Sequence, residues 1–321
     1  MRTTARTDQA EPVSPVRRRA ASFSKIIMFS RYRYLLLCCL VLPALLIPEK
    51  EGEAQRRLAD RIDPIEELDP ERGETFLDEF RQLGLLGAYS FEFELRTMPF
   101  RGTERLLEGE LWGGRNHFGP VTLIEIADRE DPGTIVRLLV QSGEESAVWR
   151  VDFKNGDAGD VRRLSVDDWF EPIIGTDYTA FDLQMPFVFW DEFEYEGIFR
   201  VRGRPCHIFR MVPPASFREE RPGLSGVRMF LDAEFQALFR AESIGEDGEV
   251  ERVFSVIDFK KVQDEWIVKT IDLRDERTRD KTRFRVNRAA LHLDLADDVF
   301  DPDNLTEEPP RLEGGAFSSL N

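Results

Sequence analysis

The sequence predicts a mainly β protein with accessory helices, in which an antiparallel meander forms the sheet. Between residues 89 and 292, about a dozen segments have the composition of strands and are separated by short polar turns. Few helical segments lie between them, whereas a parallel sheet would need a crossover element between neighbouring strands. Asp247-Gly248 adds a typical hairpin turn, because both central residues of a type I′ turn adopt positive φ.

Residues 1–54 have the pattern of a leader followed by a signal peptide. An apolar run at residues 35–47 follows basic residues, and small residues precede the expected cleavage after Ala54. Met28 opens a conventional signal sequence and is the alternative translation start. The apolar run is shorter than the roughly 20 residues of a membrane span. We therefore expect export to the periplasm, with an uncleaved inner-membrane anchor as the alternative.

The rest of the chain is strongly acidic. Residues 55–321 carry 35 Lys and Arg against 56 Asp and Glu, a net charge of −21. Such a surface repels phosphates, which disfavours nucleic-acid binding and attachment to an anionic membrane through charge alone. Cys206 is the single cysteine in this part, so no intramolecular disulfide is expected.

A single domain is predicted at residues 55–305. Residues 55–84 place apolar side chains three and four positions apart, which predicts one or two amphipathic helices. Residues 89–96 alternate apolar and polar without interruption, as a strand with one exposed face does. Further strands are predicted at residues 106–112, 121–127, 135–140, 148–153, 194–202, 206–212, 227–232, 237–243, 250–262, 266–274 and 282–289.

Two other segments interrupt or follow the strands. An insertion at about residues 166–190 is rich in aromatic side chains and has no strand pattern. It is too apolar for an ordinary surface loop, so we expect it to cover an apolar surface of the sheet. Residues 306–321 contain Pro, Gly and Ser and are predicted to form a disordered tail.

Four short motifs in the second half of the chain resemble those of a known family. Residues 174–183 contain Gly-Thr-Asp-Tyr followed by Asp-Leu, and residues 203–206 have the pattern Gly-x-x-Cys. Residues 258–266 read Asp-Phe-Lys with a later Trp, and residues 300–305 read Phe-Asp-Pro with a later Leu, where the family has Thr before Pro. In this order and spacing they resemble the LolA-like outer-membrane lipoprotein-sorting proteins, over about two thirds of the chain after residue 54.

The resemblance implies a fold and a function. The fold would be a strongly curved antiparallel sheet forming an open, incomplete β-barrel, covered by a helical and aromatic lid. The function would be that of a monomeric, non-enzymatic periplasmic carrier, which binds acyl chains of lipoproteins or lipids and moves them toward the outer membrane. Its partners would include a membrane-bound transporter or acceptor. The alternative is a regulatory module of the cell envelope that senses lipids or lipoproteins with the same concavity.

Two sets of apolar residues are candidates for such a site. The first comes from the inward alternation of the strands, although each member could also fill an ordinary core. These cavity candidates are Phe91, Phe93, Leu111, Leu123, Leu138, Phe209 and Met211. The second set lies in the insertion, where simple packing is the alternative to a lid. These lid candidates are Trp169, Phe170, Phe187, Phe189 and Trp190.

Reactive side chains give little support for catalysis or metal binding. His117, His207 and His292 are the only histidines, and they lack the short spacing of a metal site. Cys206 and His207 are adjacent in a predicted strand, so their side chains should point to opposite faces. No Gly-x-Ser-x-Gly, Walker or Rossmann motif occurs. We therefore predict no catalytic residue, metal site or cofactor, and a lipid hydrolase that uses Cys206 is the remaining enzymatic alternative.

Overall fold

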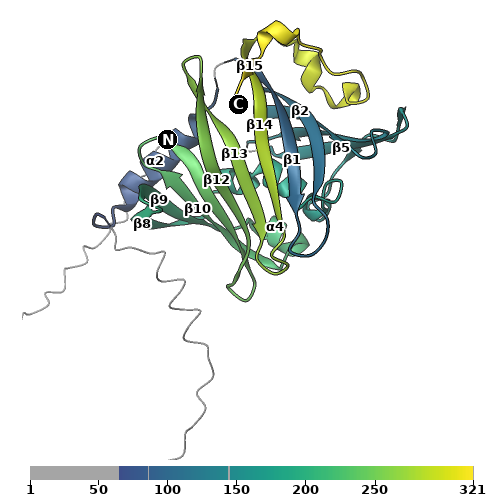
Figure 1. The fold of residues 1–321 in the computed structure, drawn as a ribbon. Helices are drawn as coiled ribbons and strands as arrows, with labels where there is room; N and C mark the ends of the chain where they lie inside the picture. The colour runs from purple at the N-terminus through teal and green to yellow at the C-terminus, as the bar shows by residue number, and fades with distance from the viewer. Residues whose placement is uncertain (1–64, 86, 144, 321) are drawn as a thin grey trace, which may run out of the picture. The chain divides into compact units, whose positions relative to one another are not determined.

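The computed structural model describes residues 65–85, 87–143 and 145–320 (Figure 1). The chain divides into the units Met1–Glu49 and Lys50–Asn321, and everything below concerns the second. The signal peptide predicted at residues 1–54 and the start of the predicted helical segment, residues 55–64, lie outside the described residues. Within the described ranges, none of the helices has both the length and the apolarity needed to span a membrane.

One antiparallel sheet of fifteen strands contains about half of the described residues. The strands are β1 Ala88–Met98, β2 Arg105–Asn116, β3 Gly119–Asp128, β4 Thr134–Gln141, β5 Ala147–Lys154, β6 Asp157–Ala158, β7 Arg162–Arg163, β8 Phe193–Val201, β9 Arg204–Met211, β10 Leu224–Asp232, β11 Ala237–Gly245, β12 Val250–Val262, β13 Glu265–Asp275, β14 Lys281–Leu293 and β15 Ser318–Ser319. The mainly β class and the antiparallel meander predicted from the sequence are confirmed.

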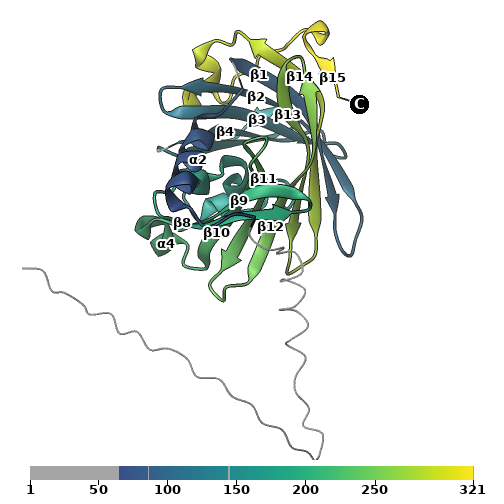
Figure 2. The ribbon, with the colours of Figure 1, turned by 90° about the vertical axis from the view of Figure 1, so that its left-hand side faces the viewer.

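Two meanders make up this sheet. Strands β1 to β5 pair in sequence order, as do β8 to β14, and β1 then pairs with β14 over most of its length. The resulting order, β6-β5-β4-β3-β2-β1-β14-β13-β12-β11-β10-β9-β8, is not closed. Its two ends are β8 and the group β5 to β7, and the chain between these ends contains the insertion (Figure 2). The predicted open barrel is therefore present, and its opening lies where the insertion begins and ends.

The insertion forms short helical turns instead of strands. It contains η1 (Asp168–Phe170), α3 (Ala180–Gln184) and η2 (Pro186–Phe189). Thr179 caps α3, because its hydroxyl accepts from the N–H of Asp182 at 3.4 Å, while its own N–H donates to the Asp182 carboxylate at 2.9 Å. Met185 ends α3 in the left-handed conformation, and Pro186 then starts η2. A further helix, α4 (Ala215–Glu220), joins β9 to β10.

Helix α2 (Pro70–Gln82) covers the inner face of the sheet beside β8 and β9 (Figure 2). Its first turn is capped by Asp69, whose carboxylate accepts from the N–H of Arg72 at 3.1 Å. Leu77 points inward and is fully buried. Gly73 allows the close approach to the strand, since a Cβ there would lie 2.5 Å from the ring of Tyr195 on β8.

The C-terminal segment, residues 294–320, corrects the prediction of a disordered tail. It contains η3 (Asp297–Phe300), η4 (Pro302–Asn304), η5 (Gly314–Ala316) and β15, which pairs with β14. Leu305 and Leu320 are the apolar anchors, at 2% and 0% exposure. Composition alone indicated disorder because the few apolar residues are spread among polar ones, and each is buried only against distant strands. We call this segment the strap.

Candidate functional site

The interior of the open barrel is the candidate site, and the protein's own side chains fill it. One large apolar cluster, the interior core, joins both meanders, α2 and the insertion. Its fully buried members include Leu77, Leu107, Leu138, Phe181, Phe209 and Met229. One cavity lined by the insertion and by strands β11 to β13 holds only about 10 Å³, the volume of about one water-sized probe. Because the insertion occupies the concavity, we call residues 166–190 the plug.

The register of the strands decides which cavity candidates face this interior. Phe93, Leu138, Phe209 and Met211 are buried in the interior core, and the partly buried Leu111 packs against it. Phe91 lies opposite Leu111 and therefore shares its face. It joins a separate cluster with Ala289, Leu291 and Leu320, at the ends of β1 and β14. These six residues lie on one face, in two clusters.

Leu123 was assigned to the wrong face. It lies opposite Trp112 of β2, whereas its neighbour Ile124 lies opposite Leu111. Directly opposed side chains share a face, so Leu111 and Leu123 point to opposite sides of the sheet. Leu123 packs on the outer face with Trp112 and Leu305, beneath the strap. Because both faces of β3 are covered, an apolar residue on this strand does not show which face of the sheet its side chain points to.

All five lid candidates contact the interior core. Trp169, Phe187 and Trp190 are buried in it, and the partly buried Phe170 and Phe189 pack against it. The sequence reasoning missed four further buried members, although the first three lie within the insertion. These are Ile173, Tyr178, Phe181 and Phe217. Phe181 is central, with ring centroids 4.7 Å from Phe170 and 5.7 Å from Phe187.

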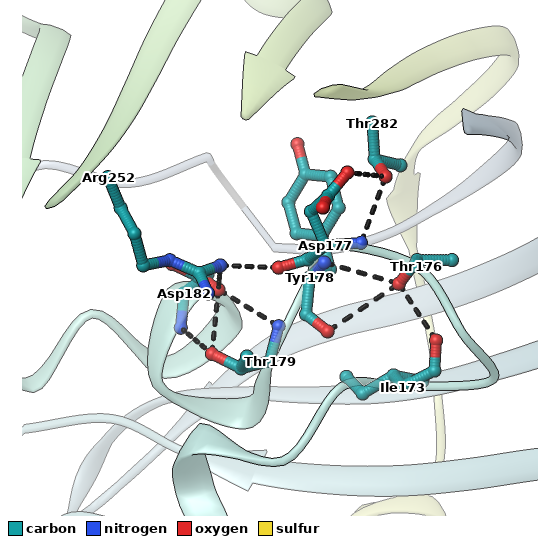
Figure 3. A network of polar contacts seen from close by, with 8 residues as sticks. All are labelled: Ile173, Thr176, Asp177, Tyr178, Thr179, Asp182, Arg252 and Thr282. Atoms are coloured by element: carbon teal, nitrogen blue, oxygen red, sulfur yellow. Dashed lines mark hydrogen bonds and ion pairs between the residues drawn. The ribbon is translucent and has the colours of Figure 1, made fainter. Parts of the chain in front are cut away.

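A polar network, which we call the latch, joins the plug to β12 and β14 (Figure 3). The guanidinium of Arg252 donates to the carboxylate of Asp182 at 2.6 Å and also to the backbone carbonyl of Asp177. The hydroxyl of Thr282 donates to the Asp177 carboxylate at 2.7 Å and accepts from the Asp177 N–H at 3.0 Å. Burial raises the pKa of Asp177, and the hydrogen bond from Thr282 opposes this shift.

The plug is also bonded to the first meander and to α2. Arg105 on β2 donates to the carbonyl of Ile174 at 3.3 Å, and Ser142 after β4 donates to the carbonyl of Gln184 at 3.2 Å. Arg81 on α2 donates to the carbonyls of Val188 and Trp190, at 2.8 and 2.7 Å. The plug therefore bridges the two meanders across the opening of the sheet.

Several polar atoms of the plug are buried without a hydrogen-bond partner. Among the described residues, such atoms are Nε1 of Trp169, the hydroxyl of Tyr178 and Oε1 of Gln184, together with Nε1 of Trp112 on the outer face. Burial raises the pKa of Tyr178 well above its ordinary value, so this hydroxyl is neutral. A buried unpaired polar group costs about 1–3 kcal/mol. Three of these four atoms belong to the plug, so their burial raises the free energy of the state in which the plug fills the interior.

A buried histidine lies beneath α2. The ring of His207 stacks on Phe76 at 3.9 Å, and its Nδ1 is 2.9 Å from the hydroxyl of Tyr195. Burial lowers its pKa to about 4, and the nearby charge of Arg72 adds to the shift. His207 is therefore neutral at pH 7 and belongs to the packing between helix and sheet.

Cys206 is separated from this histidine, as the alternation of the strand predicts. It is fully buried in an outer cluster with Ile208, Phe230 and Phe239. Burial raises the pKa of the thiol to about 12, with a contribution from Asp232. A thiol in this state is a poor nucleophile. Within the described ranges, no group of three or more His, Cys, Asp or Glu side chains is arranged to hold a metal ion.

Comparisons with known proteins support the fold. A family model described as "Uncharacterized protein" matches residues 155–307, the part that holds the plug and the second meander. The comparison with curated proteins gives no match. A DUF1329 family protein from Desulfovibrio piger is 16% identical with a TM-score of 0.62, covering 76% of this chain and 100% of that chain.

Two further solved structures are similar. An outer membrane lipoprotein-sorting protein domain from Vibrio parahaemolyticus is 15% identical with a TM-score of 0.63, covering 74% of this chain and 100% of that chain. A LolA superfamily protein from Nitrosomonas europaea is 13% identical with a TM-score of 0.52, covering 73% and 99%. At these identities the likeness shows the fold alone. The chain has a LolA-like fold, as its motifs predicted.

Proposed function

We propose that this protein is a periplasmic, non-enzymatic carrier that binds acyl chains of lipids or lipoproteins inside the open barrel and moves them toward the outer membrane. The plug leaves the interior when a chain enters. The observation that carries this proposal is the nature of the occupant. The interior is filled by a short insertion that spans the opening of the sheet and buries three polar atoms without partners.

The energies of the two occupants are of similar size. An acyl chain of about 15 methylenes gains about 12 kcal/mol when it leaves water, at roughly 0.8 kcal/mol per CH₂. The plug buries the large aromatic side chains of Trp169, Phe181, Phe187 and Trp190. At about 1.5–3 kcal/mol each, these contribute about 6–12 kcal/mol. The gain from burying an acyl chain is therefore similar in size to the contribution of these four side chains.

The similar structures support this proposal through their names. The Vibrio domain is named for lipoprotein sorting, and the Nitrosomonas protein belongs to the LolA superfamily. Their solved structures share the fold of this chain, at TM-scores of 0.63 and 0.52. Binding an apolar guest requires only apolar surface, so a carrier of this kind needs no reactive group.

Weakening the latch should make uptake easier. In Arg252→Met, Asp182 stays buried without its cation, which destabilises the filled state by about 3 kcal/mol. We expect a fluorescent fatty acid to bind several-fold faster than to the wild type, measured by stopped-flow fluorescence. Arg283→Met is the matched control, since Arg283 pairs with Asp272 through a 2.6 Å contact that involves no plug residue. Its uptake rate should equal that of the wild type.

The same proteins allow a direct search for the guest. Protein purified from its native envelope without detergent should carry lipid, detected by native mass spectrometry and by extraction. The proposal is wrong if no lipid is recovered and neither the wild type nor Arg252→Met takes up the acyl probe.

A further inference from the structure

An exposed aromatic patch lies at the hairpin between β12 and β13. Phe235, in the turn between β10 and β11, is 44% exposed, and Trp266 at the start of β13 is 55% exposed. The ring centroid of Phe235 lies 6.0 Å from that of Trp266 and 6.5 Å from that of Phe259 on β12. We call these three residues the rim patch. The hairpin that carries two of them projects beyond its neighbours in Figure 1.

The rim patch is continuous with the apolar interior. Phe259 is partly buried and packs against the interior core, as does Val268, the residue opposite it on β13. The turn that carries Phe235 lies beside α2, because the side-chain amide of Gln236 donates to Glu79 at 3.3 Å. The apolar surface of the interior therefore reaches solvent at this rim, next to the helix that covers the barrel.

The charge around the rim patch differs from that of the whole chain. The full sequence has a net charge of −17, whereas residues 258–269 hold three lysines and three acids and are neutral. The lysines are Lys260, Lys261 and Lys269, and the acids are Asp258, Asp264 and Glu265. Arg204, paired with Asp232 at 2.9 Å, also lies over the ring of Phe235 at 5.4 Å. This hairpin therefore adds no net repulsion from lipid phosphates where its aromatic side chains are exposed.

We propose that the rim patch docks the protein onto the surface of a phospholipid bilayer. Trp266 enters the headgroup layer, where an aromatic side chain with a polar N–H is favoured, and Phe235 adds apolar surface beside it. Lys261 on β12, which lies opposite Trp266 and therefore shares its face, extends beside them, with its stem along the apolar surface and its ammonium group toward phosphates. This inference rests on the proposed function. Once the protein is docked, an acyl chain leaving the bilayer would contact apolar surface all the way to the interior.

Vesicle binding tests this docking. We expect the wild type to co-sediment with phosphatidylcholine vesicles. The double variant Phe235→Ala with Trp266→Ala should bind at least ten-fold more weakly. Phe118→Ala is the matched control, because Phe118 is also 44% exposed but lies in the turn between β2 and β3. It should bind vesicles like the wild type.

Other outcomes would overturn the inference. Lack of vesicle binding by the wild type would do so, as would equal binding by the double variant and the wild type when both are folded by circular dichroism. If the double substitution instead abolishes a dimer seen by sedimentation velocity, a second copy of the chain covers the patch and the bilayer does not.

A separate measurement distinguishes this inference from the proposed function. Uptake of a soluble, short-chain acyl probe without vesicles depends on the interior alone and should be unchanged in the double variant. If vesicle binding fails while probe uptake persists, only the docking is wrong. If vesicle binding persists while no protein takes up the probe, the carrier function is wrong and the docking stands.

Discussion

The plug and the part of the strap around Leu305 cover opposite faces of the same sheet in different ways. Beneath the strap, Arg137 donates to the carbonyl of Leu305 at 2.7 Å and to that of Glu307, and it pairs with Glu125 at 2.6 Å. The plug is also bonded to the sheet, but three of its buried polar atoms have no partner, against one, on Trp112, at the face that the strap covers. A structural cover is expected to satisfy its polar groups. The difference suggests that the strap is a fixed part of the fold and the plug is an exchangeable occupant.

Truncating one anchor of each cover is the strongest test of this comparison. Phe181→Ala in the plug and Leu305→Ala in the strap should each lower the free energy of unfolding by about 3–5 kcal/mol, because both side chains are at most 2% exposed. Urea denaturation measures this loss. Only Phe181→Ala should also increase the affinity for an acyl probe, since its cavity opens inside the barrel. Equal gains in the two variants would remove the distinction between the covers.

His207, which lies under α2 on the inner side of the sheet, should make the stability of the protein depend on pH. Its pKa is lowered to about 4 in the folded protein, below the ordinary value of 6.5. Between these values the unfolded chain binds a proton that the folded chain does not, so stability falls as the pH falls from 6.5 to 4. The loss should reach about 3 kcal/mol at pH 4.

Urea denaturation across this pH range checks the expectation. His207→Phe keeps the stack on Phe76 and removes the titrating group, so it should flatten that part of the profile. His117→Phe is the control, because His117 lies in an exposed turn, and it should leave the profile unchanged. A profile identical in wild type and His207→Phe would show that His207 does not titrate as described.

The smallest expected effect concerns the unpaired hydroxyl of Tyr178. Tyr178→Phe removes a buried polar group without a partner, so we expect it to raise the free energy of unfolding by up to about 1 kcal/mol and to slow probe uptake. Ser90→Ala is the contrasting change, since this buried hydroxyl donates to Glu110 at 2.6 Å. It should lower stability by about 1 kcal/mol. Thermal denaturation of the two variants would refute the expectation if both changes had the same sign.

Much of the fold was predictable from local sequence. Residues 89–96 alternate without interruption, and they form the central part of β1. The aromatic composition of residues 166–190 indicated that this segment must cover apolar surface, and its five candidates all contact the interior core. These patterns are local because the two faces of a strand alternate by chain stereochemistry, and because exposed aromatic clusters are costly wherever they lie.

The candidate site was less predictable. Leu123 and Leu111 are equally apolar, but the pairing of Leu111 with Ile124 places them on opposite faces. Leu320 was expected in a disordered tail, because its burial depends on strands far away in the sequence. The sequence also could not show that the insertion fills the interior, because an insertion that caps a cavity and one that fills it have the same composition.

The sequence by itself determined the positions of the twelve longer strands, where the chain leaves the sheet, and that both the insertion and the inner face are apolar. Only the tertiary structure decided which face is the interior, that β1 pairs with β14, and that the plug occupies the space an acyl chain would need. The reason is physical. Alternation is set by each residue and its neighbours, whereas the register and the volume between sheet and insertion depend on side chains brought together from both ends of the domain.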